Sequence, residues 1–510
     1  MMGKRKILKR TIAWVLALAM VLGMLPYGQM GSVLAASDEL LEVEEPVSKD
    51  AQTDSISATE RKIKINDNWR FNLLTTRREI DNSLDKTASQ LDYAEEGEWS
   101  TVTLPHDWSI YQGFTDSEAR AAQGSLPGGT GWYRKSFTLS DDMKGKNVVL
   151  QFDAVQMVSE VWINGENLGK QYLGYVTFEY DITDYLRFDG KENVIAVKAY
   201  SSRNSARWYP GAGIYGSVYL IATDKVHIPV NGVHVATVVE EDGEYIQPDF
   251  HTEPNMEALK EKSTVNVRTS IENSSENPTE VSVHSVIYSK TNPEVAKASK
   301  ENIKIPAGET EKIDQLIDIK NPDLWNVDDP NLYWVKTEIV QNGEVVDTMD
   351  TRFGIRYLYL KPGSFEAPYS ENNTQGGLFI NGVYTKVNGV CEHRDMGALG
   401  METYQAAIDR RIRKLKDMGV NVVRCAHNPV SAEYIEAADR LGMLVFEEGF
   451  DQWLLQKNSD DYHNYFNKAA DGETVVFEYS ASGGIDSYIR WVNPDLVPNC
   501  VRDIQAMVDR

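Results

Sequence analysis

Apolar and polar residues alternate in short runs between residues 59 and 225. The runs include "NVVLQFDAV", "EVWING" and "NVIAVKAY", and their alternation is typical of strands with one buried face. Asn164-Gly165, directly after the second run, favours a tight hairpin turn. Because the segment has many short strands and no long helical period, it is predicted to form an all-β sandwich.

Residues 226–352 repeat this strand pattern as a second unit. Its strands include "STVNVRTSIENS", "EVSVHSVIYS" and "LYWVKTEIV", with turn residues between them. A unit of roughly a hundred residues with this pattern has the size of an immunoglobulin-like sandwich. A second β-sandwich is therefore predicted here.

The pattern changes to alternating strands and helices in residues 353–510. Strands are predicted at "GVYTKVNGVCEH", "NVVRCA" and "MLVFEE". Between them, residues 403–418 carry apolar residues at helical spacing and stop at Gly419. The next helix is capped by Ser431 and ended by Gly442, and a third is predicted at "LVPNCVRDIQAMVDR".

Alternation of strand and helix predicts a parallel sheet, of which the (β/α)8 TIM barrel is one closed form. Eight such units need roughly 250 residues, whereas residues 353–510 hold the first three. The third strand would then be an unpaired edge. We expect an incomplete barrel, with the sequence ending inside it.

The N-terminus has a pattern of its own. Five basic residues precede the apolar run "TIAWVLALAMVLGMLP" and the small-residue stretch "SVLAAS". This order is typical of a secretory signal peptide, so residues 1–36 are predicted to be removed by cleavage near Ala35 or Ala36. An uncleaved membrane anchor is the alternative, although the apolar run is short for a span. We expect a secreted or cell-surface protein without membrane contact after cleavage, and residues 37–58 as an acidic linker.

Net charge and cysteine content narrow the function classes. The formal charge of −24 works against nucleic acid as a partner, because binding to phosphates needs clustered Lys and Arg. The sequence has three cysteines, Cys391, Cys425 and Cys500, which argues against a disulfide framework in an exported chain. A bridge between Cys391 and Cys425 is one reading, and buried free thiols are the favoured one.

Charged and hydrogen-bonding residues follow each predicted strand of the last segment. The three groups are Glu392, His393 and Asp395; Arg424, His427 and Asn428; and Glu447, Glu448, Asp451 and Trp453. Ligands of parallel α/β folds meet these strand ends, because the loops converge there. Two histidines at equivalent strand ends indicate a site, although a single histidine would more often be structural. Arg424 lies within an apolar strand and is expected to be buried, and a buried guanidinium needs a carboxylate partner to offset its desolvation. It either orients that site or forms a structural ion pair with Glu447, Glu448 or a residue outside this sequence.

The neighbouring Glu447 and Glu448 suggest a two-carboxylate mechanism, which in its retaining form needs carboxyl groups roughly 5 Å apart. Successive strand residues point to opposite faces, however, so these side chains should diverge. We expect one of them to hold Arg424 or His427 instead. HExxH and CxxC spacings do not occur in the sequence, so a dedicated transition-metal site is disfavoured. The nucleophile-elbow pattern GxSxG and the P-loop pattern are absent as well.

Aromatic residues of the first β unit lie beside polar and glycine-rich segments. They occur in "LPHDW", "GTGWYRKSF" and "RWYPGAGIYGSVYL" and include Trp108, Trp132, Trp208 and Tyr209. Such residues are by default the core of a sandwich. Tryptophan beside Asp and Arg also suits a sugar ring, which offers a face for stacking and hydroxyls for hydrogen bonds. Periodicity leaves both readings open.

Taken together, these segments resemble glycoside hydrolase family 2, which includes β-galactosidases, β-glucuronidases and β-mannosidases. The resemblance covers about residues 60 to 510 and is carried, in family order, by "LPHDW", "GTGWYRKSF", "WYPGAGIYG", "LWNVDDPNLYWVKTEI", "TRFGIR", "NGVYTKVNGVCEHRDMGALG" and "NVVRCAHNP". It implies a sugar-binding jelly roll over 59–225, an immunoglobulin-like domain over 226–352 and the N-terminal part of a TIM barrel over 353–510. Gly216 departs from the pattern, since many relatives have arginine after "GIY".

The resemblance also implies hydrolysis of a terminal β-linked sugar with retention, by an acid/base glutamate and a nucleophile glutamate. The acid/base follows an asparagine in relatives, and the sequence contains no Asn-Glu pair. Both catalytic glutamates are therefore expected beyond Arg510, and the chain by itself is expected to be inactive. His393, His427 and Asp107 match sugar-contacting positions, and Arg424 and Asn428 lie within the matched barrel motif.

The sequence leaves alternatives for the substrate, the function class and the bound ions. The motif "GVCEHRDMGALG" is most similar to the β-galactosidase branch, so a β-galactoside is the favoured substrate, with a glucuronide, mannoside or other β-linked oligosaccharide as alternatives. A non-catalytic carbohydrate-binding protein is the second hypothesis. No cofactor is required, the resemblance allows a bound Na⁺ or Mg²⁺, and it leaves a homo-oligomer open.

Overall fold

A computed structural model describes residues 53–75, 81–95, 97–115, 124–201, 208–363, 376–449 and 496–509. The predicted signal peptide and residues 37–52 of the predicted linker lie outside the described residues. The end of that linker prediction is wrong, because strand β1 (Asp54–Ile56) pairs in parallel with residues 137–139. Among the described residues, no helix has the length and apolarity to cross a bilayer.

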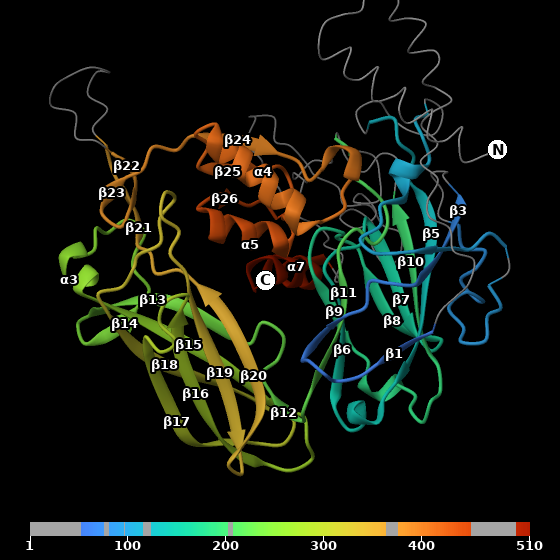
Figure 1. Ribbon diagram of the computed structural model, residues 1–510, viewed down its shortest axis with the longest axis horizontal. Helices are drawn as coiled ribbons and strands as arrows, with labels where there is room; N and C mark the ends of the chain where they lie inside the picture. The colour runs from blue at the N-terminus through green and yellow to red at the C-terminus, as the bar shows by residue number, and fades with distance from the viewer. Residues whose placement is uncertain are drawn as a thin grey trace, which may run out of the picture. The chain divides into compact units, whose positions relative to one another are not determined.

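The first domain is a β-sandwich, as predicted (Figure 1). One sheet contains, in spatial order, β4 (Ser100–Val102), β3 (Trp69–Thr75), β5 (Gly129–Leu139), β10 (Asn193–Ser201), β7 (Val158–Ile163) and β8 (Glu166–Gln171), with β1 beside β5. The other contains β2 (Lys62–Lys64), β11 (Val218–Thr223), β6 (Asn147–Phe152) and β9 (Phe178–Asp181). Short 3-10 helices occur at η2 (Trp108–Tyr111), η4 (Asp141–Met143) and η5 (Thr183–Tyr185).

Large aromatic side chains fill the space between these two sheets. Trp69, Trp108, Tyr133, Phe137 and Phe152 are fully buried and belong to one apolar cluster. Each aromatic side chain removes about 150–250 Å² from water, so the aromatic residues dominate the stabilisation of this core. The Asn164-Gly165 turn joins β7 to β8 with positive φ angles of 53° and 92°, which confirms the predicted hairpin.

The second domain is the predicted immunoglobulin-like sandwich (Figure 1). One sheet contains β12 (Val226–His227), β15 (Lys262–Asn273), β13 (Val233–Glu241) and β14 (Glu244–Ile246), with β18 (Thr310–Lys320) beside β15. The other contains β17 (Ala296–Ile305), β16 (Thr279–Ser289), β19 (Tyr333–Gln341) and β20 (Glu344–Phe353). A short helix, α3 (Met256–Glu261), precedes β15 and was not predicted. Strand β18 buries Ile313, Ile317 and Ile319 and exposes the residues between them except Gln315.

A small antiparallel sheet follows and corrects one prediction. It contains β21 (Leu358–Lys361), β22 (Gly377–Ile380) and β23 (Val383–Tyr384). The segment "GVYTKVNGVCEH" was predicted as one strand, but it holds two, β23 and β24 (Gly389–Glu392), which pair in different sheets. Asn381 and Gly382, directly before β23, form a tight turn with φ angles of 51° and 84°. This turn pairs β23 with β22, and the chain then leaves the small sheet before the next strand begins.

The predicted parallel sheet is present. Strand β25 (Val422–Cys425) pairs in parallel with β24 (Gly389–Glu392) and with β26 (Leu444–Phe446). Helix α4 (Gln405–Asp417) follows the 3-10 helix η6 (Gly397–Leu399), and α5 (Ala432–Leu441) follows β25 (Figure 1). Apolar residues of α4, β25 and α5 form one cluster that includes Ile408, Ile412, Val423 and Ala437.

The helix boundaries follow the predicted signals. The Ser431 hydroxyl accepts a hydrogen bond from the Tyr434 N–H, and Gly442 ends α5 with a φ of 73°. The third predicted helix is α7 (Leu496–Asp509). Its Arg502 donates a hydrogen bond of 2.8 Å to Gln171 of the first domain, so α7 contacts the jelly roll.

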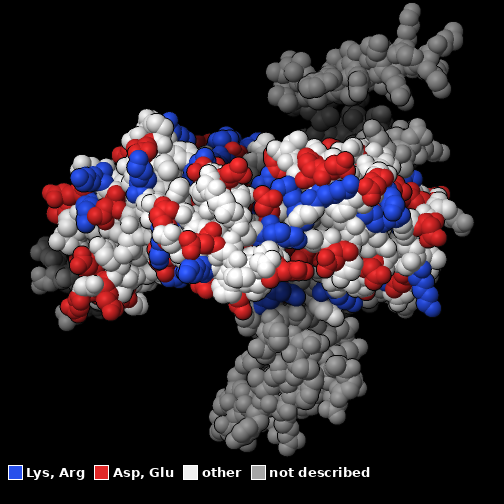
Figure 2. Space-filling view, turned by 90° about the horizontal axis from the view of Figure 1, so that it is seen from below, with Lys and Arg blue, Asp and Glu red and all other residues white. Residues whose placement is uncertain are grey.

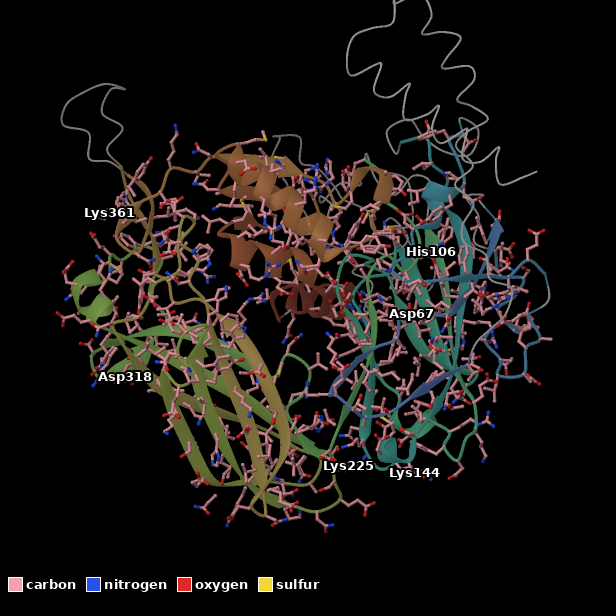
Figure 3. All side chains as sticks on the ribbon, in the orientation of Figure 1. Asp67, His106, Lys144, Lys225, Asp318 and Lys361 are labelled. Atoms are coloured by element: carbon pink, nitrogen blue, oxygen red, sulfur yellow. The ribbon has the colours of Figure 1, made fainter. Side chains whose placement is uncertain are left out.

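The surface charge is mixed in sign although the chain is acidic. Figure 2 shows Lys and Arg side chains interspersed with Asp and Glu across the face seen from below. Of the labelled side chains in Figure 3, Lys144 pairs with Asp189 at 2.7 Å and Asp318 pairs with Lys262 at 3.1 Å. These pairs are exposed, so each contributes little to stability.

Candidate functional site

The parallel register brings three strand ends to one level. Glu392 is opposite Cys425, and Arg424 is opposite Phe446. The residues that follow β24 and β25 are therefore neighbours, and the ring centroids of His393 and His427 lie 6.0 Å apart. This confirms that the two histidines, far apart in the sequence, share one location.

A tryptophan of the first domain completes this group. The Trp208 indole stacks on the His393 imidazole, with centroids 4.5 Å apart and an interplanar angle of 4°. It also lies 5.5 Å from the His427 ring at an angle of 54°. The sequence left Trp208 open between core and ligand contact, and it is only half-buried. The jelly roll thus supplies an aromatic wall to a cluster on the barrel strands.

Glu448 connects the arginine and the second histidine. The Arg424 Nε donates to Glu448 Oε1 at 2.7 Å, and His427 Nδ1 lies 2.9 Å from Glu448 Oε2. Burial raises the pKa of Glu448, but hydrogen bonds from His427 and Arg424 outweigh it and leave that pKa below its ordinary value. The carboxylate is therefore ionised at neutral pH.

The neighbouring Glu447 points elsewhere. Its Oε1 accepts a hydrogen bond of 2.8 Å from the Val430 N–H. The prediction that the two glutamates diverge, with one of them holding Arg424 and His427, is confirmed. Arg424 itself was treated as a buried guanidinium, which is wrong, since its side chain is 44% exposed.

Asn428 lies deeper than the histidines. It is buried, and within the described ranges its amide oxygen has no hydrogen-bond partner. The side chain lines a cavity of about 40 Å³ together with Trp208 and His393. A space of this size accommodates water rather than a sugar ring, and a water there would satisfy the amide oxygen.

Asp107 is a structural anchor, and this corrects the prediction that it contacts substrate. Its carboxylate is fully buried and accepts four hydrogen bonds, from the Tyr209 hydroxyl at 2.6 Å and the N–H groups of Met401, Ala212 and Ser109 at 2.9, 3.0 and 3.2 Å. Burial raises its pKa to about 6 against the effect of these hydrogen bonds. Asp107 comes from the same loop as His106, which Figure 3 labels. It ties two jelly-roll loops to the barrel loop that contains Met401.

Glycines make this close approach feasible. A Cβ on Gly400 would lie 2.4 Å from Asp107 Oδ2, and a Cβ on Gly211 would lie 3.1 Å from the same atom. Both glycines have positive φ angles, 58° and 72°. Gly216, where many relatives have arginine, also lies close to neighbouring backbone. A Cβ at this position would lie 2.8 Å from the Ala154 backbone nitrogen.

Arg394 is a second anchor, which the sequence did not reveal. Its Nη2 donates to the Tyr175 carbonyl at 2.8 Å, and its Nη1 contacts the Tyr215 hydroxyl. The guanidinium carbon also lies 5.0 Å from the Tyr175 ring centroid. The only available signal was its position beside His393, which does not indicate partners in another domain.

The cysteines and the candidate metal ligands lie partly within the described residues. In the described part of the chain, Cys391 and Cys425 form no disulfide, as favoured, but Cys391 is exposed rather than buried. The side chains of Cys500, Asp451 and Trp453 lie outside the described residues. Across the ranges that the structure describes, no three His, Cys, Asp or Glu side chains converge as a metal site. A bound Na⁺ or Mg²⁺ therefore stays an expectation of the resemblance.

Three family models match the chain in succession. The sugar binding domain of glycosyl hydrolases family 2 matches residues 63–224, a further family 2 domain matches 244–356, and the family 2 TIM barrel domain matches 373–480. The chain belongs to glycosyl hydrolases family 2. Its N-terminal sugar-binding domain, immunoglobulin-like domain and start of a TIM barrel follow the family order.

Named relatives fall into more than one branch of the family. A β-galactosidase of Bacteroides ovatus is 34% identical over 81% of this chain and 44% of the relative. A putative β-glucuronidase of Formosa agariphila is 32% identical over 78% of this chain and 34% of the relative. A solved family 2 structure from Bacteroides cellulosilyticus superposes with a TM-score of 0.67 at 32% identity, covering 80% of this chain and 48% of that one. The chain spans less than half the length of these relatives.

Proposed function

We propose that the chain carries the sugar-recognition part of a family 2 glycosidase, and that the sugar is a β-linked galactoside. The observation that supports this most is the cluster in which Trp208 lies flat on His393 and beside His427 at the strand ends. An aromatic wall with adjacent hydrogen-bonding nitrogens suits a sugar ring, which has an apolar face and a rim of hydroxyls.

The role of these residues is to bind and orient. Family 2 membership implies a retaining hydrolysis, in which two carboxyl groups act on opposite sides of the glycosidic bond. The histidines would hold ring hydroxyls while Trp208 restricts the plane of the sugar. Correct placement of the reacting bond lowers the barrier, because the orientational entropy is lost on binding rather than in the transition state. The buried Asp107 and the half-buried Arg394 would keep Trp208 in register with the barrel strands.

A neutral glycone is favoured over a glucuronide by the charge pattern. Recognition of a sugar carboxylate needs a cation free to pair with it. Arg424 already pairs with Glu448, and Arg394 binds the Tyr175 carbonyl and the Tyr215 hydroxyl. Arg411, which lines the same cavity as His393, contacts the Asp395 carbonyl. Among the described residues, these guanidinium groups near the histidines are thus engaged. The β-galactosidase relative from Bacteroides ovatus agrees with this, whereas the β-glucuronidase relative keeps a glucuronide as an alternative. A mannoside stays an alternative from the family resemblance alone.

Ligand binding provides the direct test. Isothermal titration of the purified chain should show methyl β-galactoside binding at least tenfold more tightly than glucuronic acid or methyl β-mannoside. Tighter binding of glucuronic acid would overturn the galactoside assignment, and binding of none of the three would overturn sugar recognition. Hydrolysis of p-nitrophenyl β-galactoside is measured in parallel. No turnover is expected, because the sequence contains no Asn-Glu pair, and turnover above a buffer blank would contradict this expectation.

We also propose that the protein is exported. The basic, apolar and small-residue succession of residues 1–36 supports this. N-terminal sequencing of the protein from the culture medium should find a start close to Ser37. Recovery only from the cytoplasm with Met1 intact would contradict it.

A further inference from the structure

We propose that Glu448 is a positioning residue that keeps the imidazole proton of His427 on Nδ1, so that His427 and His393 both offer Nε2 as a hydrogen-bond acceptor. Two acceptor nitrogens select ligand groups that donate, which are hydroxyls, and disfavour a carboxylate. The choice of ligand rests on the proposed function, whereas the position of the protons does not.

The tautomer of His393 follows from its partner. Its Nδ1 forms a hydrogen bond with the main-chain carbonyl oxygen of Ala426. A carbonyl oxygen can only accept, so Nδ1 must carry the hydrogen. In the neutral ring, Nε2 then has a lone pair and no hydrogen. The backbone therefore sets this tautomer without help from any ionisable side chain.

His427 is different, because two groups compete for the same nitrogen. The acceptor Glu448 Oε2 lies 2.9 Å from Nδ1, and the donor Arg424 Nη2 lies 3.5 Å from it. The carboxylate requires a hydrogen on Nδ1, and the guanidinium would require a lone pair there. The shorter contact belongs to Glu448, whose lowered pKa keeps it charged. Removal of Glu448 would leave the arginine as the neighbour and favour the opposite tautomer.

The two rings then act as a pair. They share Trp208 as a neighbour, and within the part of the chain that the structure describes neither Nε2 forms a hydrogen bond. A sugar hydroxyl can donate to such a nitrogen. A carboxylate has only lone pairs, so it would be desolvated opposite another lone pair, which is unfavourable. Glu448 thereby acts on specificity through His427 without touching the sugar.

Nitrogen NMR measures the proposed proton positions. The chain is labelled with ¹⁵N-histidine, and long-range ¹H–¹⁵N spectra at pH 8 distinguish the two tautomers. The signals are assigned from the His393→Gln and His427→Gln variants. Both rings should be Nδ1–H in the unsubstituted protein, and His427 in the Nε2–H form would overturn the proposal without use of any further variant.

The Glu448→Ala variant tests the role of the carboxylate. His427 should change to the Nε2–H form while His393 stays unchanged. Glu447→Ala is the matched control, because that neighbour bonds the Val430 N–H and should leave both tautomers as they are. A Glu448→Ala spectrum identical to that of the control would overturn the proposal.

Binding measurements distinguish a failure of the role of Glu448 from a failure of the proposed function. Glu448→Ala should weaken binding of methyl β-galactoside about tenfold, and Glu447→Ala should change it less than twofold. If the tautomers are as stated but no galactoside binds to the unsubstituted protein, the proposed function fails and the role of Glu448 stands. If galactoside binds but the His427 tautomer is Nε2–H, the role of Glu448 fails alone.

Discussion

The immunoglobulin-like sandwich and the junction between jelly roll and barrel use charged residues in opposite ways. In the sandwich, ion pairs such as Arg268–Asp314 lie on the surface, with side chains 51% and 47% exposed. At the junction, the carboxylates of Asp107 and Asp153 are 0% and 8% exposed. A strand sandwich buries alternate apolar residues and needs no charge inside. A junction of loops has backbone N–H groups that require buried acceptors.

The buried hydrogen bonds of the junction explain where the group of Trp208, His393 and His427 lies. Trp208 belongs to the jelly roll and the histidines belong to the barrel, so their stacking depends on the relative placement of two domains. Directional hydrogen bonds, accepted by Asp107 and donated by Arg394, define that placement more narrowly than apolar contact would. Buried hydrogen-bonding groups can fix the relative placement of two domains. The protein then loses stability when any partner of such a hydrogen bond is removed.

The largest expected effect follows from removing the central acceptor of the junction. Asp107→Ala would leave the N–H groups of Met401, Ala212 and Ser109 and the Tyr209 hydroxyl without their acceptor. We expect the free energy of unfolding to fall by about 3 kcal/mol. Urea unfolding followed by tryptophan fluorescence measures it. A loss below about 1 kcal/mol would show that the junction is no more sensitive than the surface.

The next effect concerns pH. Burial, together with the nearby Glu433, raises the pKa of Asp153 from 3.8 to about 7, and Lys62 and Lys64 oppose the shift. The folded protein thus keeps a proton that the unfolded chain has lost. Stability from this group is full below about pH 4 and is lost as the pH rises to about 7.

The Asp153→Asn variant isolates this contribution. Its stability should change less than that of the unsubstituted protein between pH 4 and 7, because an amide does not titrate. Thermal unfolding across this pH range supplies the comparison. Parallel curves for the two proteins would assign the pH dependence to other groups.

A smaller effect is expected at the aromatic wall. Trp208→Ala should weaken galactoside binding about tenfold, or about 1.4 kcal/mol, since the sugar face loses its stacking partner. Trp208→Phe keeps an aromatic face and should recover part of the affinity. Isothermal titration provides the values. Equal affinity for the alanine variant and the unsubstituted protein would remove Trp208 from the site.

The smallest effect is expected in the sandwich. Asp314→Ala breaks the exposed pair with Arg268 and should cost less than about 1 kcal/mol. It is the matched contrast to Asp107→Ala, because both remove an aspartate that accepts hydrogen bonds. A comparable loss in the two variants would abolish the distinction between the two regions.

Local features were predictable because they depend on neighbours in the sequence. The Asn164-Gly165 hairpin, the Ser431 cap and the divergence of Glu447 and Glu448 each follow from backbone geometry over a few residues. The split of "GVYTKVNGVCEH" into β23 and β24 was missed, because the two strands pair with different neighbours, β23 with β22 and β24 with β25. Strand pairing between distant segments is not a local property of the sequence.

The sequence by itself determined the order of domains, the strand ends that hold the histidines, and the family to which the chain belongs. Only the tertiary structure decided that Asp107 is an anchor, that Arg394 reaches Tyr175, and that Trp208 lies on His393. Periodicity reports whether a side chain faces inward or outward from its own element. Periodicity carries no information on which distant element contacts that side chain, because this contact depends on how the domains pack against one another.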